Sequence, residues 1–413
     1  MTLPIPTRYA LRSLLRHKRR TFLSIVGIGV GCGICLFLIA FVSGEGEMMM
    51  RAAAQTGVGH LRVAPAEWVK TRENDLRLSD WQPLLEDLRA MEHVEVAAPH
   101  AVTDALLAMG TRTAGVVMIG VDPDVEPAIN RLVREVARGE YLTRESQGET
   151  VIGKGLAERL DVGVGDDLMV TASGTDGDLK SAMLRVRGIV ATGSRSLDNS
   201  LCDVLLADVA NVSGRPGAAE ISILLKNHER MPETKDAVAR LISPNQTVVS
   251  WEVIVPELAD GVKVDETWTN LIVGVVVIVV FLGIASAQLA AVLERRKEFA
   301  VLSAVGMKGG RLVRIMLAEG LVLGLTGAVL ALLLAVPVVY WTATHGIDFG
   351  EMMKDADLTM SNIMLDPVIY TQFGWWLVPL AFGLSLIATM LSSLYPAWYA
   401  LGVDPAEALR VEQ

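Results

Sequence analysis

Four apolar stretches, each roughly 20 residues or longer, limit what this chain can fold into. They are residues 21–42, 269–293, 315–341 and 374–394. A run of this length crosses the core of a bilayer, and backbone groups in lipid must be hydrogen-bonded within their own segment. The mean hydropathy of +0.41 is high for a soluble chain of 413 residues. The sequence therefore predicts an integral membrane protein with four transmembrane helices.

Basic residues gather on one side of these spans. Lys and Arg are frequent before the first span and between the second and third spans, whereas Lys354 stands alone among acidic residues between the third and fourth. Because basic loops stay in the cytoplasm, we expect both termini to be cytoplasmic. The cytoplasmic parts are then residues 1–20, 294–314 and 395–413, and the parts outside are residues 43–268 and 342–373.

Motifs of the common enzyme classes are missing from the sequence. The Gly153–Lys154 pair is not followed by a hydroxyl residue as in a Walker A loop, and neither H-E-x-x-H nor G-x-S-x-G occurs. The six histidines are scattered, and His93 and His100 lack a metal-binding spacing, so we expect surface or core roles for them. With a net charge of −10, the chain also gives no sign of a nucleic-acid partner. We expect no catalytic residue, metal or cofactor in this chain.

The long external segment, residues 43–268, predicts an α+β domain. GHLRVAP, VEVAAPHAVTDALLAMG and AGVVMIGVDP have the pattern of strands, and WQPLLEDLRAM has the apolar spacing of a helix. AEISILL, MPETKDAVARLI and QTVVSWEVIV then predict a strand, a helix and a final strand. This order suits a ferredoxin-like core, which residues 138–209 interrupt with short β-rich runs that predict an inserted subdomain.

Two loops allow a sharper interpretation than a plain turn. VGVGDDL, residues 162–168, could cradle a phosphate, but a turn before a strand is favoured because no helix start or Lys-Ser/Thr follows. Residues 342–373 could form a short cap on the larger domain. Asp355 and Asp357 there match only part of a calcium loop, so a solvated loop is favoured over a calcium site.

Three features lie inside the apolar stretches. Gly27, Gly29, Gly31 and Gly33 form small-x-x-x-small pairs, which suit close helix packing either within the chain or across a dimer seam. Cys32 and Cys35 form a C-x-x-C match, for which small side chains on one helix face are favoured over a redox or metal pair. Glu319, near the start of the third span, could belong to a proton relay, but pairing with nearby arginines is favoured.

The charged stretch after the second span predicts a cytoplasmic continuation of that span. It is either a basic loop that only sets the topology or a helix that docks on a soluble partner. This stretch resembles the hallmark segment of ABC-transporter permeases of the FtsX/MacB superfamily. Its sequence is ERRKEFAVLSAVGMKGGRLVRIMLAEG. The ending LYPAWYALGVDPAEALRVE, the entry RYALRSLLRHKRRTFLSIVGIGVG and the runs GHLRVAP and GETVIGKGLAERLDVGVGDDLMV are similar to the same family. The resemblance covers nearly the whole chain, in order.

The resemblance implies four spans, a large external domain with a porter-like core and an inserted sabre-like part, dimerisation with a copy or a paralogue, and location in the bacterial inner membrane. It also implies a separate ATPase subunit that binds ATP and Mg. The helix that couples to this subunit would comprise Glu294, Arg295, Arg296, Lys297, Glu298, Phe299, Leu302, Val305 and Gly306. Asp404, Pro405 and Glu407 would begin a short C-terminal helix, with Asp as N-cap and Pro at N1.

The layout without a fused ATPase resembles the lipoprotein-releasing LolC/LolE-like branch. It implies a permease that transmits ATP-driven motion to its external domain and moves a lipoprotein or another hydrophobic cargo from the outer leaflet. The alternatives are a MacB-like efflux permease that works with an adaptor and an outer-membrane channel, and an FtsX-like signalling permease that regulates an external cell-wall hydrolase. A membrane enzyme is disfavoured because the catalytic motifs are missing.

Overall fold

The computed structural model describes residues 18–175, 177–294, 309–351, 359–360 and 363–401. These residues form two units. The first consists of residues 1–45, 263–347 and 369–413, and the second of residues 46–262 and 348–368, in so far as they are described.

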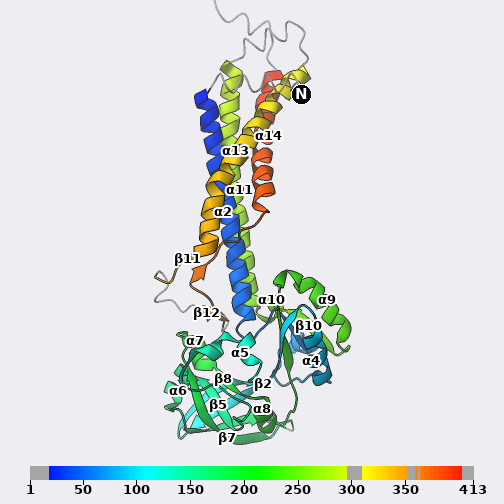
Figure 1. Cartoon of the computed structure of the whole chain (residues 1–413), viewed down its shortest axis with the longest axis vertical. Coiled ribbons are helices and arrows are strands. Elements are labelled where there is room, and N and C mark those ends of the chain that lie inside the picture. The colour runs from blue at the N-terminus through cyan, green and yellow to red at the C-terminus, as the bar shows by residue number, and fades with distance from the viewer. Residues whose placement is uncertain (1–17, 176, 295–308, 352–358, 361–362, 402–413) are drawn as a thin grey trace, which may run out of the picture. The chain divides into compact units, whose positions relative to one another are not determined.

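Four long helices account for the apolar stretches (Figure 1). They are α2 (Lys18–Ala54), α11 (Pro256–Glu294), α13 (Gly309–His345) and α14 (Leu377–Leu401). Each contains a window that is long and apolar enough to cross a bilayer. The prediction of four membrane helices is confirmed.

Two of these helices extend well beyond their apolar stretches. α2 continues past residue 42 to Ala54, and α11 begins at Pro256, before residue 269. Within the second unit, Met49 and Ala53 of α2 pack with Leu258 and Ala259 of α11 in one buried cluster. The extensions escape a hydropathy search because only one face is apolar, and tertiary packing rather than lipid stabilises them.

Small residues allow close packing among the membrane helices. A Cβ placed on Gly29 would lie 2.7–2.9 Å from three side-chain atoms of Leu330 in α13, and one on Gly31 would lie 2.3 Å from Val280 Cγ2 in α11. Gly33 faces α13 with slightly more room, whereas a Cβ on Gly27 would meet no atom within 4 Å. Three of the four glycines thus pack against helices of the same chain.

The first part of the external sheet contains β1 (Leu61–Pro65), β9 (Glu220–Leu225), β10 (Gln246–Ser250) and the beginning of β2 (Val94–Met109). Their order is β10-β1-β9-β2, all antiparallel, with α4 (Trp81–Ala90) after β1 and α9 (Met231–Leu241) after β9. Leu84, Leu85 and Leu88 of α4 are buried in the core of this part, as their helical spacing predicts. This is the strand order of a split β-α-β motif.

One strand prediction is partly wrong. The final strand ends at Ser250, and the following residues form α10 (Trp251–Ile254). Trp251 and Val255 are apolar and β-prone, but their side chains fill the cluster with α2 and α11. Packing therefore overrides their local preference.

The second part of the sheet closes on itself. It contains β3 (Arg112–Val121), β5 (Glu149–Gly153), β6 (Asp167–Ser173), β7 (Leu179–Val190) and β8 (Cys202–Leu205). The pairings run β2-β3-β8-β5-β7, and β6 pairs with both β7 and β2, which completes a ring. β4 (Val136–Gly139) adds to β7 outside the ring. Ring closure leaves these strands without free edges.

Helices and a buried core complete this second part. α6 (Lys154–Leu160) and α8 (Leu206–Ser213) cover the ring, and α7 (Arg195–Ser200) precedes β8. The core contains Leu107, Met118, Ile152, Leu156 and Leu168, all fully buried. The residues predicted as an insertion therefore share their sheet with β2 and β3.

VGVGDDL forms the predicted turn, in which the Gly163 N–H donates to Asp166 Oδ2 over 2.8 Å.

The remaining short elements are α3 (Trp68–Thr71), α5 (Glu126–Ile129), η1 (Arg131–Glu135) and η2 (His228–Arg230) in the second unit. Two small ladders pair β11 (Ile347–Asp348) with β14 (Val368–Ile369) and β12 (Thr359–Met360) with β13 (Ile363–Met364). Ile363 is buried in the cluster with α2 and α11, so part of the second external loop packs on the larger domain.

Replacing Gly29 with Ala should destabilise the helix bundle by about 1–3 kcal/mol, because the new methyl group would overlap the base of the Leu330 side chain. Thermal unfolding of the detergent-purified protein measures this. Gly27→Ala is the matched control, since its methyl group meets open space, and it should leave the melting temperature unchanged or slightly raised. Equal melting temperatures for both variants would contradict the packing described.

Candidate functional site

The predicted coupling segment falls mostly outside the described residues. Glu294 is the last residue of α11, and α13 begins at Gly309. Outside the described residues lie Arg295, Arg296, Lys297, Glu298, Phe299, Leu302, Val305 and Gly306, and also Asp404, Pro405 and Glu407. α14 continues through Pro396 to Leu401. Glu319 is half-buried within α13, and its role stays a prediction.

An apolar cleft lies between α2 and α11 in the membrane unit. Its volume is about 350 Å³, and it is lined from α2 by residues that include Leu23, Gly27 and Ile28, and from α11 by residues that include Val280 and Gly283. A Cβ on Gly27 or Gly283 would meet no atom within 4 Å, so the two glycines open the cleft. A cleft with these walls can hold an acyl chain or an apolar side chain of a neighbouring helix.

A buried ionic cluster lies where the two parts of the external sheet meet. His100 Nε2 is 2.8 Å from Glu126 Oε2, and Arg62 Nη1 is 2.8 Å from Glu220 Oε2. His100 Nδ1 is 4.0 Å from Glu220 Oε1, which links the two pairs. All four side chains are at most 11% exposed. With His100 protonated the cluster holds two cations and two carboxylates, so its charges balance.

The cluster changes the pKa of His100. Burial disfavours the charged imidazolium, but the carboxylate of Glu126, and more weakly that of Glu220, outweighs burial and raises the pKa of His100 above its ordinary 6.5. Nearby, Tyr141 donates a hydrogen bond to Asp203 Oδ2 over 2.8 Å. Burial, together with the charge of Glu126, raises the pKa of Asp203 to about 7.

Reasoning from the sequence missed this cluster. The sequence predicts a surface or core role for His100 without indicating a partner for it, and Glu126 begins a short helix that no periodicity marks. The four side chains come from β1, β2, α5 and β9, which are far apart in the chain. A weak signal exists, because His100 lies within the run VAAPHAV, whose other residues are all apolar.

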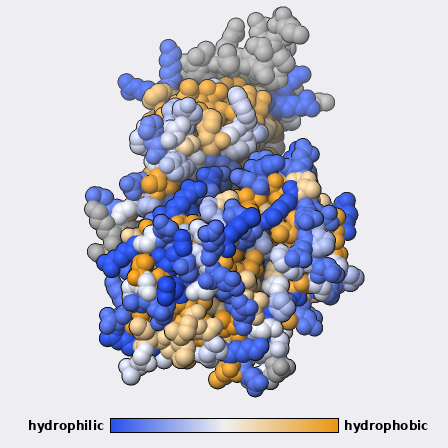
Figure 2. Space-filling view, turned by 60° about the horizontal axis from the view of Figure 1, so that its bottom comes forward, coloured by the Kyte–Doolittle hydropathy of each residue, from blue (hydrophilic) through white to orange (hydrophobic). Residues whose placement is uncertain are grey.

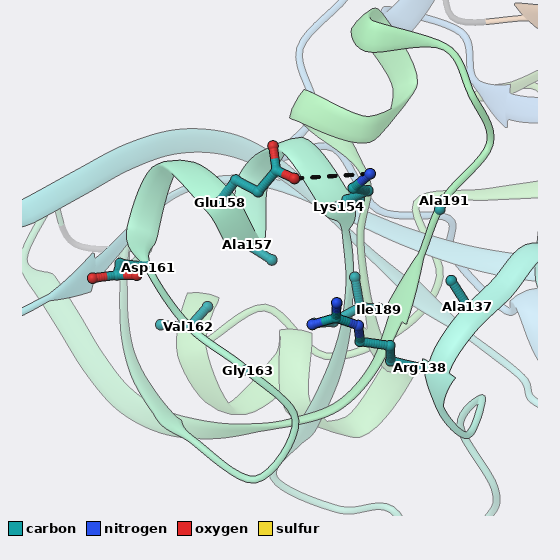
Figure 3. A pocket seen from close by; sticks show the side chains of 10 residues that line it. All are labelled: Ala137, Arg138, Lys154, Ala157, Glu158, Asp161, Val162, Gly163, Ile189 and Ala191. Atoms are coloured by element: carbon teal, nitrogen blue, oxygen red, sulfur yellow. Dashed lines mark ion pairs between the residues drawn. The ribbon is translucent and has the colours of Figure 1, made fainter.

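A surface pocket of about 430 Å³ opens between β4, α6 and the end of β7 (Figure 3). Arg138 and Lys154 lie on opposite sides of it, over a floor that includes Ala157 and Ile189. Lys154 Nζ is 3.9 Å from Glu158 Oε1, and Asp161 also lines the pocket. Its charges are mixed, so the pocket does not select one class of ligand.

Apolar side chains also reach the surface of the external domain, where Figure 2 shows hydrophobic areas between hydrophilic ones. On the outside of the strand ring, Leu106, Val117, Met169 and Met183 are 41–59% exposed. Met169 and Met183 are direct cross-strand partners. Among the described residues, no group of three or more His, Cys, Asp or Glu side chains is arranged to hold a metal ion.

The external domain should lose stability as the pH rises above about 7. The raised pKa of His100 means that its ion pair stabilises the fold fully below 6.5 and is lost as pH rises through the folded value. Asp203 retains its proton in the folded state between 3.8 and about 7, so its contribution also falls with rising pH, but over that lower window. His60, whose pKa burial and then His228 lower to about 4, acts oppositely below 6.5.

The measurement is the melting temperature of the full-length protein between about pH 7 and 9, where His60 has finished titrating and the last part of the Asp203 titration is shared by the wild type and the variant. We expect a decrease of several degrees in the wild type and a flatter profile in His100→Gln. A wild-type profile as flat as that of the variant would contradict a charged His100 in the folded protein.

Two family profiles together cover most of the chain. The MacB-like periplasmic core domain matches residues 21–241, and the FtsX-like permease C-terminal domain matches residues 270–405. The lipoprotein-releasing system transmembrane protein LolC of Xylella fastidiosa is 24% identical over 99% of both chains. LolE of Haemophilus influenzae is 21% identical over 94% of this chain and 93% of its own.

Other similar proteins match over only part of one of the two chains. The macrolide export ATP-binding/permease protein MacB of Campylobacter jejuni is 20% identical over 89% of this chain but only 58% of its own length. Among solved structures, the extracellular domain of the noncanonic ABC-type transporter YknZ from Gram-positive bacteria is 16% identical, with a TM-score of 0.35 over 46% of this chain and 98% of that domain. Since the MacB-like profile alone matches more than half of the chain, this protein belongs to the FtsX/MacB family of ABC-transporter permeases.

Proposed function

We propose that this chain is the permease subunit of a lipoprotein-releasing type of ABC transporter in the bacterial inner membrane. It transmits ATP-driven motion of a separate ATPase subunit to its external domain, which moves a lipoprotein or another hydrophobic cargo from the outer leaflet. The observation that carries the proposal is the end-to-end match to proteins named for lipoprotein release, which cover 99% of this chain. The MacB relatives match over only 58% of their length.

The coupling to the ATPase takes place at the charged segment between α11 and α13. Residues 294–314 hold Arg295, Arg296 and Lys297 beside the apolar Phe299 and Leu302, a composition that suits docking into a groove of a soluble subunit. Because α11 ends at Glu294 and α13 begins at Gly309, any movement of this segment acts directly on two membrane helices. ATP and Mg belong to the partner subunit, and this chain supplies the mechanical part.

A second permease, a copy or a paralogue, packs against α11. Only 6% of the most apolar window of α11 is buried, compared with 39–44% in the other three spans. Its exposed side chains repeat at alternating intervals of four and three residues, which is the pattern of a helix seam. They are Val264, Trp268, Leu271, Val275, Ile278 and Leu282, each 52–59% exposed.

The cargo enters through the cleft between α2 and α11. Its walls are almost wholly apolar and its volume of about 350 Å³ suits part of an acyl chain. The exposed Leu106, Val117, Met169 and Met183 of the external domain offer further apolar contact after extraction. An uncharged cleft open to lipid supports a hydrophobic cargo over a polar solute.

Labelling from outside tests the orientation. Lys354→Cys should react with a membrane-impermeant maleimide in intact spheroplasts, whereas Lys297→Cys should react only after permeabilisation. The native cysteines Cys32, Cys35 and Cys202 are buried and give little background. Labelling of Lys297→Cys in intact spheroplasts would reverse the topology and remove the proposed ATPase contact.

Replacing Glu294 and Arg295 with Ala should abolish most co-purification of the ATPase subunit, because it removes charges from the start of the coupling segment. The control is the double variant Arg144→Ala/Glu145→Ala, which removes an adjacent, charge-neutral pair of exposed residues from the external domain. Affinity purification from membranes measures the ratio of the two subunits. Normal recovery of the ATPase with the Glu294/Arg295 variant would count heavily against this coupling site.

A further inference from the structure

The residues that follow α2 are tied to the segment that contains Glu126. The Gly57 N–H donates to the Ile129 carbonyl over 3.2 Å, and the Arg131 N–H donates to the Gln55 carbonyl over 2.7 Å. Thr56 and Asn130 form an isolated antiparallel bridge between these contacts. The last turn of α2 therefore leads into a short two-sided backbone contact with residues 129–131.

Apolar packing reinforces this contact. Ala54, the last residue of α2, forms one buried cluster with Ile129 of α5, Ala98 of β2 and Leu224 of β9. Ala54, Ile129 and Ala98 are each 0% exposed. The cluster leaves no room for independent movement of the end of α2 and the beginning of β2, because tightly packed interiors transmit displacement.

Side chains continue the connection from this contact to the ionic cluster. Asn130 Nδ2 donates to Glu126 Oε1 over 2.9 Å, and the second carboxylate oxygen of Glu126 is 2.8 Å from His100 Nε2. Asn130 Oδ1 also accepts from the Leu132 N–H over 3.1 Å, which fixes the start of η1. Glu126 thus joins the contact at the end of α2 to His100.

His100 occupies a special position in β2. It is the last residue of β2 that pairs with β9, opposite Glu220, and the next residue, Ala101, is the first that pairs with β3. The 16-residue strand therefore passes from one part of the sheet into the other at His100. Force applied here acts on both parts of the domain at once.

We propose that residues 126–131, held by the buried Glu126–His100 ion pair, form the joint that passes movement from the end of α2 to the point where the two parts of the external sheet meet. Glu126 is the positioning residue of this joint. The inference rests on the proposed mechanical function for its effect on cargo release, whereas the joint itself rests on the contacts within the external unit. Arg131 adds a second attachment, because Nη1 is 2.8 Å from Asp366 Oδ1 in the other external segment.

The joint depends on the protonation of His100. The charged groups that face this side chain are Glu126 from α5, Glu220 from β9 and Arg62 from β1, and Asp203 of β8 lies near Glu126. Deprotonation leaves two carboxylates against Arg62 alone and weakens the hold of His100 on Glu126. Coupling should therefore weaken as the pH outside rises.

The test uses the full-length chain in lipid nanodiscs and compares Glu126→Gln with Asp161→Asn. Gln keeps the size of Glu126 and an acceptor for Asn130 but removes the charge. Asp161→Asn is the matched control: it makes the same charge change in an ion pair of the same domain, with Arg112 at 2.6 Å, on the exposed surface. Asp161 has a φ of 60°, which Asn tolerates.

Hydrogen exchange is the first readout and needs no partner subunit. In Glu126→Gln, a buried charge pair is broken. The amides of Gly57, Arg131 and the second half of β2 should therefore all exchange at least roughly tenfold faster than in the wild type. Asp161→Asn should exchange like the wild type. Faster exchange near Glu126 without a change at Gly57 would overturn the joint.

The second readout is cargo released per ATP hydrolysed in the reconstituted complex, as a function of pH. The wild-type ratio should fall as the pH rises, and Glu126→Gln should give a low ratio that does not depend on pH. Asn130→Ala keeps the ion pair, so its ratio should be reduced but should still depend on pH. This variant distinguishes loss of the ion pair from general misfolding of the domain. The proposal would be overturned if Glu126→Gln released as much cargo per ATP hydrolysed as the wild type, with the same dependence on pH. Failure of the wild type to bind any ATPase would refute the proposed function separately, and exchange at Gly57 would then decide the joint.

Discussion

A backbone that crosses lipid has to satisfy its hydrogen bonds within the same segment, and this constraint determines the membrane part of the chain. Four stretches become helices for this reason, and the large domain is placed between the first two. α2 and α11 do not stop at the end of their apolar runs. They continue into the external unit, where Met49, Ala53 and Leu258 pack in one cluster, so that the same two helices that span the membrane also begin and end the external domain.

Inside the membrane, helix packing depends on the space that is left where a residue has no side chain. Gly29 and Gly31 allow Leu330 and Val280 to approach the backbone of α2. Gly27 and Gly283 instead leave space, and a cleft lies there. Neighbouring glycines of one sequence motif thus have opposite uses, close contact and open volume. The difference depends on the residue opposite each glycine, because Gly31 meets Val280 of α11, whereas Gly27 lines the cleft with Gly283 of the same helix.

The external domain combines a split β-α-β sheet with a closed ring of strands, and β2 belongs to both. A strand that changes partners halfway is a natural place for strain or movement to pass between the two parts. The charged side chains buried at this position are unusual, because four ionisable groups in an apolar interior are costly unless their charges balance. Arg62, His100, Glu126 and Glu220 meet that condition only while His100 is protonated.

The sequence alone determined the membrane class, the four spans and most external strands and helices, because hydropathy and side-chain periodicity are local signals. It also carried the family resemblance, since ERRKEFAVLSAVG and YPAWYALGVDPAEALR are contiguous motifs. Only the tertiary structure decided that α2 and α11 extend beyond their apolar runs, that Trp251 starts a helix rather than prolonging a strand, that β2 is shared by two parts of the sheet, and that His100 meets Glu126 and Glu220. These features depend on contacts between residues distant in the chain, and such contacts leave no periodic trace in a single sequence.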